Sequence, residues 1–236
     1  MTRSRWIIFA LICIVTIGGL ILLSKKDSVN VNDMDASKAV SETETSIGDH
    51  VYGNKASQVL LIEYGDFQCP GCGGAFPQLK TLKEEYKDQI GFIFRNFPLT
   101  AIHPNALSAA TAAEAAGLQG KFWEMHDKLY ENQTAWSSID PSQRTDVFAG
   151  YAEEIGLDGA KFKSDLSDPK IATKISRDRA LGNKLGVNST PTLYLGNEKL
   201  SEEEVSDLIQ GTGEKLRTKI DAKLKAAGIE TPKRTE

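Results

Sequence analysis

Cysteine and histidine are scarce in this chain, and their scarcity limits the metal chemistry that it can support. Among 236 residues there are 3 cysteines and 3 histidines. The histidines stand far apart, and Cys13 lies in an apolar segment near the N-terminus. A structural zinc site needs four ligands, so Cys69 and Cys72 do not complete one. We therefore expect no metal and no organic cofactor.

An excess of basic residues is also lacking. The chain has 28 Lys and Arg against 32 Asp and Glu, which gives a net charge of -4 and a pI near 5.5. This balance argues against nucleic acid as a partner. With 40% hydrophobic and 25% charged residues, the chain has an ordinary globular composition and room for one good-sized domain.

The one long apolar run is not followed by a processing site. Residues 6–23 carry no charge, and the short segment 1–5 before them and residues 25 and 26 after them supply basic flanks. As a helix the run would be about 27 Å long, enough to cross a bilayer. Neither an Ala-x-Ala-like site nor a cysteine follows it, which favours an uncleaved transmembrane anchor over a cleaved signal peptide.

The segment after this anchor is polar. Residues 24–46 are rich in Ser, Asp, Glu, Asn and Lys and have few large apolar side chains. Such a composition predicts a flexible linker, with a mean reach of about 25–30 Å. The folded domain is expected over residues 47–228, followed by a frayed tail at 229–236.

Two cysteines lie at the centre of the chain's organisation. Val59 to Ile62 is an unbroken apolar run that predicts a buried strand. After the cysteines, apolar side chains recur at helical spacing at Phe76, Leu79, Leu82 and Tyr86. Cys69 is thus expected at a helix N-terminus, where free N–H groups and the helix dipole favour a thiolate, with Cys72 one turn inside. Because so short a disulfide loop stabilises little, we infer thiol–disulfide chemistry.

The rest of the chain alternates further predicted elements. A strand is expected over 90–97, and helices over 105–117, 121–132, 140–156, 158–166, 169–185 and 214–226. Ser201 and Glu204 predict a capping box at the start of one further helix. Pro191 begins a β-rich run that turns back at Gly196. Trp123 and His126 are expected in the core rather than as a ligand pair.

Four stretches carry a family resemblance. They are Glu63 to Cys72, Phe94 to Leu99, Gly120 to Asp127 and Thr190 to Thr192. In this order they resemble DsbA-type thiol oxidoreductases over about residues 47–226, and most of all the membrane-tethered kind found in bacteria with a simple envelope. The resemblance implies an α/β thioredoxin fold with an inserted helical domain at about 105–166. It also implies a cis Thr190–Pro191 bond that faces the cysteines.

The resemblance also implies roles for single residues. Cys69 would be the exposed cysteine that carries the mixed disulfide, and Cys72 its buried partner. Glu63 would lie beneath the disulfide with a raised pKa and relay protons for Cys72; the alternative is a solvated acid at a strand end. Thr190 and Pro191 would bind an extended substrate segment. Between the cysteines stands Pro70-Gly71, where the best-known oxidases carry Pro-His.

These expectations combine into a function. We predict a single-pass membrane protein whose catalytic domain lies on the extracytoplasmic side and donates disulfides to cysteine-containing exported proteins. A membrane partner similar to DsbB or to a vitamin K epoxide reductase-like protein would reoxidise it. Two alternatives stay open: an outward-facing disulfide reductase or isomerase, and a non-catalytic thioredoxin-like module that binds a metal or a client.

Overall fold

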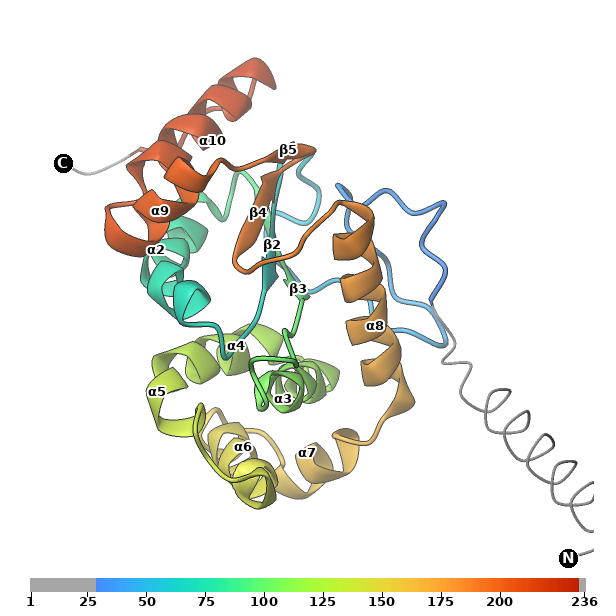
Figure 1. Cartoon of the computed structure of the whole chain (residues 1–236). Coiled ribbons are helices and arrows are strands. Elements are labelled where there is room, and N and C mark those ends of the chain that lie inside the picture. The colour runs from blue at the N-terminus through green and yellow to red at the C-terminus, as the bar shows by residue number, and fades with distance from the viewer. Residues whose placement is uncertain (1–28, 234–236) are drawn as a thin grey trace, which may run out of the picture. The chain divides into compact units, whose positions relative to one another are not determined.

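The computed structural model describes residues 29–233 (Figure 1). The predicted anchor at 6–23, the start of the predicted linker and residues 234–236 of the predicted tail lie outside these residues. Within the described part, no helix has the length and apolar character needed to cross a bilayer. The anchor therefore stays a prediction.

A mixed five-stranded sheet forms the centre of the domain. Its strands lie in the order β1-β3-β2-β4-β5, and their bounds are β1 (Val51–Gly53), β2 (Leu60–Gly65), β3 (Gly91–Asn96), β4 (Thr192–Leu195) and β5 (Glu198–Lys199). β2 runs parallel to β3 and antiparallel to β4. β2 is therefore the central strand, which explains its continuous apolar sequence.

Helices cover both faces of this sheet. On one face lie α2 (Pro70–Tyr86), α9 (Glu202–Gln210) and α10 (Glu214–Ala226), and on the other α8 (Pro169–Lys184) (Figure 1). Between β3 and α8 the chain forms a group of helices, which are α3 (Ala106–Leu118), α4 (Phe122–Glu131), α5 (Gln133–Trp136), η1 (Pro141–Gln143), α6 (Arg144–Glu154) and α7 (Gly159–Asp165). This is a thioredoxin-like fold with a helical insertion, as predicted.

Most predicted elements are present, with small differences at their ends. The helix expected from residue 140 begins as the 3-10 turn η1, with the Asp140 side chain accepting a hydrogen bond from Ser142 N. The capping box that the sequence predicts at Ser201 and Glu204 is formed at the start of α9. The sequence analysis missed β1 and α5, which are too short to show a periodic pattern.

Two hydrophobic clusters stabilise the domain. One joins the sheet to α2, α9 and α10, and the other fills the insertion between α3, α4, α6 and α7 and continues to α8. Alanines of α3 are almost fully buried, which lets its neighbours approach closely. The insertion therefore has a core of its own beside the sheet.

The predicted flexible linker is wrong from Val31 onward. Residues 31–46 belong to the same compact unit as the sheet. Arg95 donates hydrogen bonds to Ala36 O and Lys38 O at 2.5 and 2.6 Å, and Lys184 to Met34 O at 2.8 Å. The composition of the segment suggested disorder because it has few apolar residues, but basic side chains distant in sequence bind its carbonyl oxygens.

A cluster of buried charges stabilises the end of this segment. Asp49 lies 2.8 Å from Arg95 and 3.2 Å from Lys174, and all three side chains are 0% exposed. Lys174 also contacts Asp178 at 2.6 Å within α8. Charges buried this deeply are tolerated only when paired, so the segment and α8 depend on each other.

Candidate active site

Cys69 occupies the N-cap position of α2, as the sequence predicts. Its backbone is extended, its N–H donates to Asp66 O at 3.0 Å, and Pro70 begins the helix. Cys72 lies one turn inside and is 1% exposed. Both cysteines are free thiols in this structure. The sulfur of Cys69 thus lies where the N-terminal N–H groups of the helix point.

The two thiols have opposite acidities. The pKa of Cys69 falls from 9.0 to about 5, first because the Cys72 thiol donates a hydrogen bond to its sulfur, and also through the N–H groups of Cys72 and Gly71. Burial raises the pKa of Cys72 well above its ordinary value. At neutral pH the reduced pair therefore consists of a Cys69 thiolate and a protonated Cys72.

Cys69 is less exposed than the sequence analysis predicted. Its exposed fraction is 8%, because the loop before β4 lies over it. The Thr190–Pro191 peptide bond is cis, and Thr190 O lies 3.2 Å from the Cys69 sulfur. A Cβ on Gly71 would lie 3.3 Å from Pro191 Cδ. The structure thus brings both predicted substrate-binding residues to the cysteine pair; their binding role stays a prediction.

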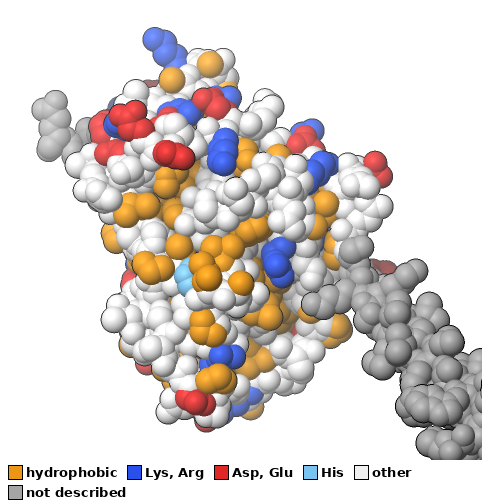
Figure 2. All heavy atoms as spheres, in the orientation of Figure 1, with side chains coloured by type: hydrophobic (Ala, Val, Ile, Leu, Met, Phe, Trp, Pro, Cys, Tyr) orange, Lys and Arg blue, Asp and Glu red, His pale blue; other side chains and the backbone are white. Residues whose placement is uncertain are grey.

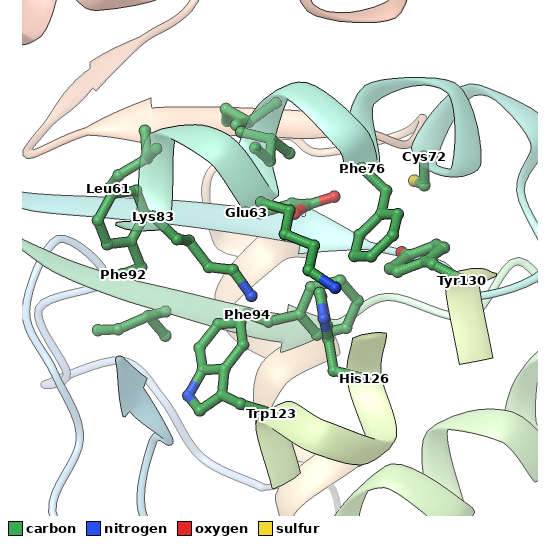
Figure 3. Close-up of a pocket in the computed structure, with 14 residues that line it drawn as sticks. Leu61, Glu63, Cys72, Phe76, Lys83, Phe92, Phe94, Trp123, His126 and Tyr130 are labelled. Carbon is green, nitrogen blue, oxygen red and sulfur yellow. The ribbon is translucent and has the colours of Figure 1, made fainter. Parts of the chain in front are cut away.

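Glu63 lies in the middle of β2 and points toward α2 with Leu61. Its Oε1 atom is shielded from solvent and has no hydrogen-bond partner among the described residues. Burial raises its pKa to about 8, while the Lys83 charge opposes the shift and Cys69 adds to it. Glu63 therefore lies inside β2 rather than at its end, and its side chain is partly exposed although Oε1 is not. Figure 3 shows Glu63 directed into a cavity that Cys72 also lines.

The sequence analysis missed a residue of the insertion that contacts the cysteine turn. Gln133, in α5, donates hydrogen bonds to Phe67 O at 2.8 Å and to Cys69 O at 2.9 Å. A Cβ on Gly73 would collide with the Gln133 amide, so a larger residue there would displace that side chain from these bonds. No local pattern connects residues so far apart, and only the fold reveals this contact.

A second missed group surrounds Glu63. Lys83 of α2 is 3.0 Å from Asp127 of α4, and its ammonium lies over the Trp123 ring at 4.3 Å from the centroid. His126 is 4% exposed, so its predicted place in the core is confirmed. Within residues 29–233, no three metal-ligating side chains gather in one place.

Comparisons with known proteins agree with this geometry. The thioredoxin family model matches residues 45–212, and the chain therefore belongs to the thioredoxin family. The thiol-disulfide exchange protein alpha-DsbA2 from Wolbachia pipientis is 25% identical, with a TM-score of 0.60 over 74% of this chain and 86% of that chain. The predicted resemblance to DsbA-type thiol–disulfide oxidoreductases is thus confirmed.

One further solved structure has the same fold, and one curated relative matches part of the sequence. BdbD from Bacillus subtilis is 20% identical, with a TM-score of 0.61 over 74% of this chain and 93% of that chain. A curated relative, Na(+)/H(+) antiporter NhaA 1 from Salinispora arenicola, is 40% identical over 151 residues, or 64% of this chain. The chain spans only 22% of the length of that relative.

Proposed function

We propose that this protein is an extracytoplasmic thiol oxidase that donates the Cys69–Cys72 disulfide to cysteine-containing exported proteins. The observation that carries the proposal is the stabilised Cys69 thiolate, whose pKa is about 5. A cysteine pair whose reduced form is stabilised by an ionised thiol gives up its disulfide readily, and is therefore an oxidant.

The reaction transfers two electrons from the client to the pair. A client thiolate attacks the Cys69 sulfur, the S–S bond breaks, and Cys72 leaves with the electron pair and takes a proton. A second client thiolate then attacks the mixed disulfide. This step releases an oxidised client and the Cys69 thiolate, which needs no proton to leave because its pKa is low.

The apolar part of the surface supports a client that is not yet folded. The exposed large apolar side chains among the described residues are Ile102, Leu107 and Leu185. Figure 2 shows hydrophobic side chains gathered across the middle of one face, whereas charged side chains lie mostly toward its two ends, over the region of α9 and α10 and at the opposite end. Such a surface suits extended segments that still expose apolar residues.

The cellular part of the proposal rests on the sequence. The uncharged run at 6–23 would anchor the chain in the cell membrane, with the domain outside, where no glutathione pool reduces thiols. Reoxidation of the pair would then need a membrane partner, similar to DsbB or to a vitamin K epoxide reductase-like protein, that passes the two electrons to a quinone.

Equilibration of the purified protein with glutathione tests the direction of reaction. We expect the Cys69–Cys72 couple to be more oxidising than the glutathione couple. A couple far more reducing than glutathione would contradict the proposal and favour the reductase reading.

A trapping experiment tests the enzymatic class. The Cys72→Ser variant should accumulate disulfide-linked client adducts through Cys69, because the resolving thiol is gone. The matched Cys69→Ser variant should form none and should keep its fold. Absence of adducts from both variants would favour a binding module without turnover.

A further inference from the structure

The cavity under the cysteine pair joins the sheet to the helical insertion. It lies between β2, β3, α2 and α4, and Glu63, Lys83, His126 and Tyr130 are directed into it (Figure 3). About 20 Å³ is open to the centre of a water molecule. Since one water needs about 10–15 Å³ by this measure, the cavity has room for one or two waters.

The polar lining of this cavity is incomplete without such water. Four buried polar atoms of residues that line it have no hydrogen-bond partner among the described residues, and these are Glu63 Oε1, Trp123 Nε1, His126 Nε2 and Tyr130 OH. Buried polar atoms in native proteins are nearly always paired. A water with two to four polar neighbours is the usual partner in such places.

The hydrogen bond that His126 makes with Asp127 shows which of its two ring nitrogens is left to accept a hydrogen bond from a water. Its Nδ1 lies 2.9 Å from Asp127 Oδ1. Burial lowers the pKa of His126 to about 4, so the ring is neutral at pH 7. Burial alone would raise the pKa of Asp127, but the His126 hydrogen bond and the Lys83 charge hold it well below its ordinary value. Nδ1 therefore carries the proton and donates to a carboxylate, which leaves Nε2 with a free lone pair.

We propose that this cavity holds ordered water joining Glu63 Oε1 to His126 Nε2, so that the helical insertion positions the water through which Glu63 exchanges its proton. His126 is a positioning residue in this scheme, since it acts on Glu63 through the water. The inference rests on the proposed thiol–disulfide exchange, in which Glu63 serves Cys72.

The protons balance along this route. When the S–S bond breaks, the Glu63 carboxyl gives its proton to the Cys72 sulfur. The cavity water then gives a proton to the Glu63 carboxylate and takes one from the Lys83 ammonium. Lys83 regains a proton from solvent beside Asp127, whose side chain is 22% exposed. The titratable and charged groups that face Glu63 or the cavity are Cys69 and Cys72, Lys80 and Lys83 of α2, and His126, Asp127 and Tyr130 of α4.

Titration of Glu63 in matched variants tests the proposal. His126→Leu removes the acceptor, whereas His126→Gln keeps an oxygen at a similar reach. In the reduced full chain with labelled glutamate, carbon NMR reads the Glu63 carboxyl against pH, and a Glu63→Gln variant assigns the signal. Because water bonds an ionised carboxylate more strongly than a neutral one, we expect the pKa of Glu63 to rise by about one unit in His126→Leu, a tenfold change in proton affinity. In His126→Gln it should stay near that of the unsubstituted chain.

Two results would overturn the proposal. One is a Glu63 titration that His126→Leu leaves unchanged. The other is an equal shift in His126→Gln or in Phe76→Leu, which changes the apolar lining of the cavity and leaves its polar atoms in place. If His126→Leu does not fold, a crystal structure of the unsubstituted chain decides: water bonded to both Glu63 and His126 supports the proposal, and a dry cavity refutes it. Neither measurement needs a client. A failure of this proposal can therefore be distinguished from a failure of the trapping experiment, which tests the proposed function.

Discussion

Replacing Cys72 by alanine should make Cys69 markedly less acidic. The hydrogen bond from the Cys72 thiol is the largest contribution to the low pKa of Cys69. Cys72→Ala removes this donor, whereas Cys72→Ser keeps an O–H at the same place. The backbone N–H groups of Gly71 and residue 72 stay in both variants. The comparison therefore isolates one hydrogen bond.

The size of the effect follows from the strength of that bond. A hydrogen bond to a charged group contributes about 1.5–3 kcal/mol, and one pKa unit corresponds to about 1.4 kcal/mol. The pKa of Cys69 should thus rise from about 5 by roughly 1–2 units in Cys72→Ala. In Cys72→Ser it should not rise, since a hydroxyl is a stronger hydrogen-bond donor than a thiol.

The pH dependence of alkylation measures this acidity. The reduced chain reacts with iodoacetamide across a range of pH, and mass spectrometry of the Cys69 peptide separates it from Cys13. We expect half-maximal rates at the pKa of each variant, because only the thiolate reacts. A Cys72→Ala profile that coincides with that of the unsubstituted protein would refute the reasoning. So would a Cys69 in the unsubstituted protein that titrates near 9.0, its ordinary value.

Three further predictions follow from the charges in the structure. The reduction potential of the Cys69–Cys72 pair should fall by about 30 mV per pH unit between pH 5 and 7, and by about 60 mV per pH unit below pH 5. The slope changes because reduction takes up one proton fewer once Cys69 is ionised. A single slope across this range would contradict the assigned acidity of Cys69. Burial raises the pKa of Glu63 from 4.5 to about 8, so stability that is present at low pH is lost as the pH rises toward 8. Glu63→Gln should therefore raise the free energy of unfolding by about 3 kcal/mol at pH 7 and hardly change it at pH 4. Urea denaturation at both pH values measures this, and an equal gain at pH 4 would exclude titration as the cause. Arg95→Met should lower the free energy of unfolding by about 3–5 kcal/mol and expose residues 31–49 to limited proteolysis, because it leaves the buried Asp49 carboxylate without its nearest charged partner. The control Lys38→Met, at an exposed ion pair, should lower it by less than about 1 kcal/mol.

The local parts of this protein could be read from the sequence. The strand before Cys69, the helix after it, the capping box at Ser201 and the turn at Gly196 all depend on residue types within a few positions of one another. Such signals survive in any surroundings, because hydrogen bonds and side-chain periodicity within one element create them. The family resemblance extended this reading to the Thr190–Pro191 loop.

The environment of each group was decided by the tertiary structure. Cys69 is covered by a loop 121 residues away, as the contact with Thr190 shows. The acidity of Glu63, the tautomer of His126 and the ordered path of residues 31–46 depend on neighbours from distant elements. The sequence alone identified the cysteine pair and its local geometry at the start of α2. Burial and charge pairing arise only when remote segments pack together, so the fold alone decided their acidity and exposure.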